Sequence, residues 1–102
     1  MKLARLYLLL AAAALAGNPV HAADVAAGKA LAEEVCADCH GDDGKGDDES
    51  PDIAKLSTKE FVKAMEDYQS GARTKSQKMA RAAKKLSAAQ VADVAAYYQT
   101  LK

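Results

Sequence analysis

The chain has 102 residues, and its 14 Lys and Arg balance its 14 Asp and Glu, so the formal net charge is zero. This length allows one domain with one small core, and the balanced charge excludes the strongly basic character of a general nucleic-acid binder. Half of the residues are hydrophobic, but 24 are Ala, and from residue 23 onward only 11 of 80 are Leu, Ile, Val or Phe. Domains so small and so poor in apolar bulk often need a disulfide, a metal or another group to complete the core.

The first 22 residues have the pattern of a secretory signal peptide. Lys2 and Arg5 precede an apolar run of 11 residues, 6–16, and small residues flank the expected cleavage point. A retained membrane anchor is disfavoured because a transmembrane helix needs about 18 or more apolar residues. We therefore expect cleavage of residues 1–22 and a mature domain, 23–102, in the periplasm of a bacterium. That domain carries 12 basic and 14 acidic side chains, a net charge of −2, with no membrane span and no affinity for nucleic acid expected.

A first helix is predicted to begin after Asp24, whose side chain can cap it. Small and apolar residues then recur at three- and four-residue steps, at Val25, Gly28, Leu31, Ala32 and Val35. This helix leads directly to the only two cysteines, in the sequence Cys36-Ala37-Asp38-Cys39-His40. Three glycines between residues 41 and 46 then predict a loop.

The two cysteines admit several interpretations. A disulfide between Cys36 and Cys39 would close too small a loop to stabilise the fold, and a zinc site needs about four ligands, whereas His40 is the only histidine of the mature chain. A thiol-disulfide oxidoreductase of the thioredoxin type would need a strand before the motif, so it stands as the alternative from another class. C-x-x-C-H is the attachment sequence for c-type haem. We therefore expect one covalently attached haem c, with thioethers at Cys36 and Cys39 and with His40 as an axial iron ligand.

The rest of the chain is predicted to be helical. A capping box at 57–60 opens a helix with Phe61, Val62, Met65 and Tyr68 on one face, and Gly71 ends it. A shorter helix is expected over Lys78 to Lys85. A second capping box at 87–90 opens the last helix, with its inward positions expected at Val91, Val94, Ala95, Tyr98 and Leu101. The sequence therefore predicts an all-α fold.

Two methionines of the mature chain could supply a second axial ligand to the iron. Met65 lies on the apolar stripe with Phe61 and Tyr68, where a methionine is more often part of the core. Met79 lies in a polar, basic stretch without large apolar neighbours. We therefore predict Met79 as the second ligand, because His and Met ligation is the arrangement that raises the potential in cytochromes c.

These motifs resemble those of class I cytochromes c of the small bacterial kind, such as cytochrome c-553 and one half of cytochrome c4. The similarity rests on the haem-binding start at 36–46, the middle helix and its exit at 61–73, and the last helix at 86–98. It covers the whole mature domain, and Met79 falls seven residues before Leu86, as the axial methionine of the family commonly does.

The resemblance implies a fold, a function and further residue roles. About four to five helices would surround one haem, with the first and last helices crossing where Gly28 approaches Val94 and Tyr97. Pro51 would offer its carbonyl to the ring nitrogen of His40 and so orient it. With both axial positions filled, we expect a one-electron Fe(II)/Fe(III) carrier, not an enzyme, serving redox partner proteins such as a respiratory complex, an oxidase, a dehydrogenase or a flavoprotein subunit. The alternatives are the haem subunit of a larger oxidoreductase, such as flavocytochrome c sulfide dehydrogenase, and a five-coordinate haem sensor or peroxidase-like protein if Met79 does not bind.

Charge is unevenly distributed along the mature chain. Residues 38–52, here called the acidic segment, hold seven acids and one base, Lys45. Residues 73–85, here called the basic segment, hold six bases and no acid. These runs are either two solvated surfaces or, as the sharper hypothesis, a basic surface near Met79 that steers an acidic redox partner.

Overall fold

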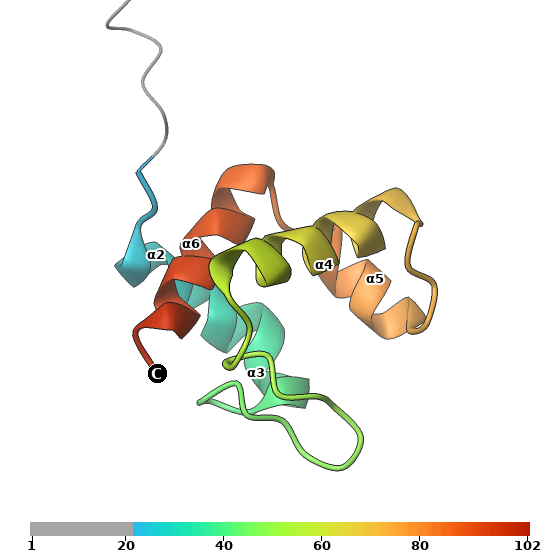
Figure 1. The fold of residues 1–102 in the computed structure, drawn as a ribbon, viewed down its shortest axis with the longest axis horizontal. Helices are drawn as coiled ribbons and strands as arrows, with labels where there is room; N and C mark the ends of the chain where they lie inside the picture. Colours follow the sequence, from blue (N-terminus) through green and yellow to red (C-terminus); the bar gives the residue numbers. More distant parts are fainter. Residues whose placement is uncertain (1–21) are drawn as a thin grey trace, which may run out of the picture.

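The computed structural model describes residues 22–102, and this part of the chain is helical without any strand. The first helical run is α2 (Val25–Leu31), a π-helical turn η1 (Ala32–Cys36) and α3 (Ala37–His40), and it is followed by α4 (Thr58–Ser70), α5 (Gln77–Ala83) and α6 (Ala88–Gln99). Figure 1 shows these elements gathered in one body, with the long loop after α3 at its edge. The predicted all-α fold is confirmed. The predicted signal peptide lies almost wholly outside the described residues.

Side-chain caps explain where the helices begin. The Asp24 carboxylate accepts a hydrogen bond from the N–H of Ala27 at 3.0 Å and so starts α2. Both predicted capping boxes are present, at Ser57 with Glu60 and at Ser87 with Gln90. The short helix α5 begins at Gln77, capped by Ser76, and ends at Ala83, two residues before the predicted end.

The first and last helices cross at Gly28, which is buried. A side chain at this position would collide with the backbone carbonyl of Asp93 on α6. Asp93 is itself only 6% exposed, and its Oδ1 accepts a hydrogen bond of 2.8 Å from the backbone N–H of Asp24. The crossing therefore depends on a glycine at the contact and on a carboxylate that holds the start of α2 against α6.

The core is small and contains much alanine. Within residues 22–102 it has eleven buried hydrophobic residues, four of them Ala: Ala32, Cys36, Ala54, Phe61, Met65, Ala83, Leu86, Val91, Val94, Ala95 and Tyr98. The rings of Phe61 and Tyr98 pack with their centroids 5.8 Å apart, which joins α4 to α6. The apolar shortage inferred from composition is thus visible in the folded chain.

Two large apolar residues of the described chain are exposed, Val25, on the periodic positions of the first helix, and Leu101, which was predicted to face inward. Val25 is 42% exposed and Leu101 is 40% exposed. Val25 is the first residue of α2. Leu101 lies beyond Gln99, the last residue of α6, so the helical spacing that predicted its inward position no longer applies there.

Candidate functional site

The two cysteines lie on neighbouring turns at the end of the first helical run. Cys36 ends the π-turn and is 7% exposed, whereas Cys39 lies on α3 and is exposed, and both thiols are free. Burial raises the pKa of the Cys36 thiol, and a side-chain hydrogen bond with Tyr98 opposes this in part. A thiol-disulfide oxidoreductase of the thioredoxin type would need a strand before the motif. In residues 22–102 a helix precedes the motif instead, which counts against that alternative.

His40 ends α3 and is held by the loop that follows. The imidazole is 7% exposed, and its Nδ1 lies 2.8 Å from the carbonyl oxygen of Pro51. Since a carbonyl oxygen only accepts, Nδ1 carries the proton in this contact, which leaves the lone pair of Nε2 for a metal. A partner of this kind fixes the tautomer and the ring orientation of a ligating histidine.

The glycines of the loop place the Pro51 carbonyl beside His40. Gly46 donates its N–H to the carbonyl of His40 at 2.8 Å and has a φ of 72°. A side chain on Gly46 would collide with the backbone of Ser50 and Pro51. The loop can therefore fold back on the histidine only with glycine here, because other residues rarely adopt this conformation and would displace the Pro51 carbonyl.

The two methionines differ in their surroundings. Met65, on α4, is 3% exposed and belongs to the core, as predicted for a packing residue. Met79, on α5, is half-buried and packs against the edge of that core, and its N–H is held by Ser76 Oγ at 3.1 Å. The structure thus brings Cys36, His40 and Pro51 together and places Met79 on a separate helix.

The residues present fit a c-type haem better than they fit a metal ion alone. Two free thiols three residues apart precede a histidine whose Nδ1 is already occupied. Within residues 22–102, no three His, Cys, Asp or Glu side chains converge as ligands for a metal ion. Cys36, Cys39 and His40 would therefore hold the group together, two as covalent anchors and one as an iron ligand.

Two glutamines that link separate elements were missed by the sequence reasoning. Gln69 Nε2 donates to the carbonyl oxygens of Ala83 and Leu86 at 2.8 and 2.9 Å. Gln99 Nε2 donates to the carbonyl oxygen of Leu56 at 2.8 Å. Gln69 lies four residues after Met65 on the buried face of α4, so a polar residue on an apolar stripe was the available signal.

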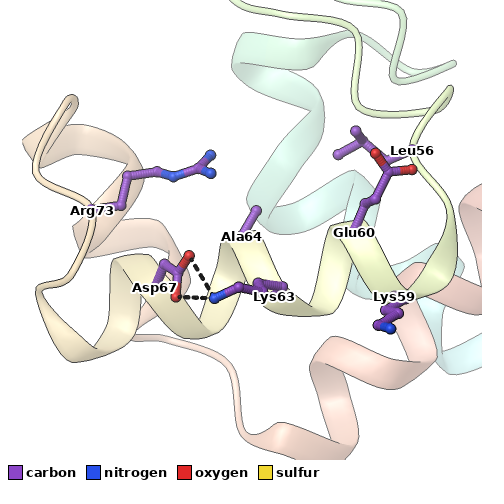
Figure 2. A pocket seen from close by; sticks show the side chains of 7 residues that line it. All are labelled: Leu56, Lys59, Glu60, Lys63, Ala64, Asp67 and Arg73. Atoms are coloured by element: carbon purple, nitrogen blue, oxygen red, sulfur yellow. Dashed lines mark hydrogen bonds and ion pairs between the residues drawn. The ribbon is translucent and has the colours of Figure 1, made fainter.

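A shallow, open pocket on α4 contains none of the predicted ligands (Figure 2). Figure 2 shows the ion pair between Lys63 and Asp67, with Lys63 Nζ 3.2 Å from Asp67 Oδ1. Arg73 extends over the pocket from the chain after α4. The Arg73 guanidinium lies 5.5 Å from the centre of the Tyr68 ring. The pocket is lined by Leu56, Lys59, Glu60, Lys63, Ala64, Asp67 and Arg73. An exposed pair of this kind contributes little to binding or to stability.

Comparison with known protein families gives a match over almost all of the described residues. A family model described as Cytochrome c matches residues 25–102, from the first residue of α2 to the end of the chain. No curated protein sequence matches the chain. In the described residues, no helix is long and apolar enough to cross a membrane.

Proposed function

Because the chain belongs to the cytochrome c family, we propose that it is a periplasmic one-electron carrier that shuttles electrons between redox proteins. Members of the family are electron-transfer proteins with covalently bound haem c, and a domain of this size typically holds one haem. The observation that carries the proposal is the hydrogen bond between His40 Nδ1 and the Pro51 carbonyl, beside two free thiols in C-x-x-C-H spacing. This arrangement prepares Nε2 of a buried histidine to bind iron.

Each proposed site residue has a distinct role. Cys36 and Cys39 would form the two thioethers, His40 and Met79 would be the axial ligands, and Pro51 would orient His40. The bound haem would supply the Fe(II)/Fe(III) couple. With two ligands from the chain, the iron would have no open coordination position for a substrate. No group that could perform acid–base chemistry is required in this role.

The periplasmic part of the proposal rests on the N-terminal pattern and on where the fold begins. Cleavage after Ala22 would leave Ala23 as the first residue, and the cap of α2 is the next one, Asp24. Among residues 22–102, the first helix begins at Val25. Cleavage after Ala22 would therefore keep every described helix and the Asp24 cap in the mature domain, as expected for a leader that precedes it.

Met79→Ala tests the proposed ligation in the haem-loaded protein. We expect loss of the weak long-wavelength band from methionine sulfur to ferric iron. We also expect the reduction potential to fall on the order of 0.2 V, within the range of about 0.8 V that axial ligands span. Absorption spectroscopy and a redox titration provide the measurements.

The matched control for this experiment is Met65→Ala. It removes a side chain that is 3% exposed and should lower the free energy of unfolding by about 2 to 5 kcal/mol, yet it should keep the band. A band that persists in Met79→Ala and disappears in Met65→Ala would reverse the ligand assignment.

We further propose that the basic segment docks an acidic redox partner. Its six charged side chains are all exposed, at Arg73, Lys75, Lys78, Arg81, Lys84 and Lys85, and Met79 lies among them. The acidic segment runs from α3 into the loop that contacts His40. The exposed bases lie on α5 and the chain on either side of it, and α5 carries the proposed second ligand, so complementary charge on a partner would accelerate association there.

Electron-transfer rates measured against ionic strength test this docking surface. The second-order rate with an acidic partner should fall about tenfold or more as salt is raised, since exposed charges are screened beyond about 10 Å at 0.1 M. Lys78→Gln and Arg81→Gln should lower the low-salt rate, whereas Lys59→Gln, an exposed change outside the basic segment, should not. A rate independent of salt would contradict the proposal.

A further inference from the structure

We propose that Gln69 is a positioning residue that holds α5 so that Met79 stays bound to iron. This inference rests on the proposed function, because it concerns the second axial ligand of that function. The inference goes beyond the proposed function because it assigns to Gln69, a side chain on α4, the task of keeping Met79 of α5 bound to the iron.

The side-chain amide of Gln69 is fully used as a donor. Its nitrogen has two hydrogens, and it lies 2.8 Å from the carbonyl oxygen of Ala83 and 2.9 Å from that of Leu86. Ala83 is the last residue of α5 and is fully buried, and Leu86 is 6% exposed. Both acceptors thus belong to the end of α5 and the turn after it, where helix carbonyls lack partners within the helix.

α5 needs such an external contact because it is only seven residues long. A helix of two turns is marginal in water, since the cost of nucleation is recovered by few hydrogen bonds. Its first turn is held from within, by Ser76 Oγ and the N–H of Met79. Within residues 22–102, the bonds of Gln69 are the only side-chain hydrogen bonds that join α5 and its last turn to another helix.

Met79 therefore lies between two fixed points, the Ser76 cap before it and the Gln69 contact after it. Without the amide of Gln69, two carbonyls at the end of α5 would lose a donor, although Ala83 would keep the N–H of Leu86 at 3.2 Å. A buried carbonyl without its partner destabilises the packed arrangement, so α5 would open more often. Each opening would release Met79 and admit a competing ligand to the iron, which raises the apparent affinity for that ligand.

Gln99 provides a matched control. It is half-buried like Gln69, and its Nε2 donates to a backbone carbonyl, that of Leu56, at 2.8 Å. This bond joins α6 to the loop before α4 and does not involve α5. Loss of a glutamine-to-carbonyl bond as such can therefore be separated from loss of the bond to α5.

The experiment is an imidazole titration of the haem-loaded ferric protein. In Gln69→Met, we expect imidazole to bind about tenfold more tightly than in the unmodified protein, and the methionine–iron band to disappear at a lower temperature than the helical signal. Gln99→Met should change the imidazole affinity by less than about twofold, the scatter expected of an unrelated site.

Each result has a defined meaning. Unchanged imidazole affinity in Gln69→Met, or an equal increase in Gln69→Met and Gln99→Met, would overturn the positioning role. If Gln69→Met does not fold, Gln69→Glu serves instead, because it keeps the shape of the side chain and removes the donor. It should show the same tighter binding of imidazole. An unchanged imidazole affinity in Gln69→Glu would equally overturn the positioning role. Met79→Ala distinguishes failure of the positioning role from failure of the proposed ligation. If imidazole binds more tightly in Met79→Ala but not in the Gln69 variants, only the positioning role of Gln69 is refuted. If the imidazole affinity is unchanged in Met79→Ala, the ligation by Met79 is itself refuted.

Discussion

Replacement of both Cys36 and Cys39 by Ala is expected to leave the mature chain largely unfolded. The described core has eleven buried hydrophobic residues, four of them Ala, and one of the others is Cys36 itself. A domain of this size is marginal even with a full core, and this one has few large apolar side chains. Without thioethers the haem would not be retained, and its contribution to the core would be lost. Circular dichroism and a thermal melt should show weak helicity without a cooperative transition.

The control for this prediction is Met79→Ala, which keeps both thioethers and therefore the haem. It should retain a cooperative melt even though its spectrum changes. A cooperative, native-like melt of the Cys36→Ala/Cys39→Ala protein without haem would show that the chain alone completes its core. The interpretation of the composition would then be wrong, while the electron-carrier proposal would have to stand on the site geometry.

Gly28→Val is expected to produce the second large effect. A side chain at Gly28 would collide with the backbone carbonyl of Asp93. Because the obstacle is backbone, it cannot rotate away as a side chain could. The helices would have to separate, which also strains the bond from the Asp24 N–H to Asp93. Overpacking in a tight core usually costs 1 to 3 kcal/mol, and we expect about 3 kcal/mol here. Denaturant unfolding of the haem-loaded protein measures the loss.

Lys29→Val is the matched control, since it places the same side chain on the neighbouring, exposed position of α2. It should change the free energy of unfolding by no more than about 0.5 kcal/mol, as is usual for surface substitutions. Equal stability of the Gly28→Val and Lys29→Val proteins would mean that α2 and α6 do not depend on this close approach.

Local signals in the sequence were enough to predict most of the helices. The Ser57 and Ser87 capping boxes act within four residues, so their outcome does not depend on the rest of the fold. The same holds for Gly71, whose φ of 86° ends α4 in the left-handed conformation. The C-x-x-C-H motif is equally local, and its histidine lies at the end of α3, the last element of the helical run that carries both cysteines.

Contacts between distant residues were beyond prediction from one sequence. Gln69 and Ala83 are 14 residues apart, and Asp24 and Asp93 are 69 apart, so no spacing rule connects them. Leu101 shows the opposite failure, because periodicity predicts an inward position only as long as the helix continues, and α6 ends at Gln99. The contact between His40 and Pro51 was expected only through the resemblance to a family, since loop closure depends on the glycines between them.

The π-turn η1 has a consequence for the register of the first helical run. Positions four apart in an α-helix drift by about 40° around the axis, because a turn takes 3.6 residues. In η1 the N–H of Ala37 bonds to the carbonyl of Ala32, five residues back, so one turn takes more than four residues. Two positions four apart in this turn are therefore displaced around the helix axis in the opposite direction to that in an α-helix. Gly28, Ala32 and Cys36, all buried, are thereby returned toward one line. A single surplus residue thus aligns the helix crossing with the buried thiol, two features that a uniform α-helix would rotate apart.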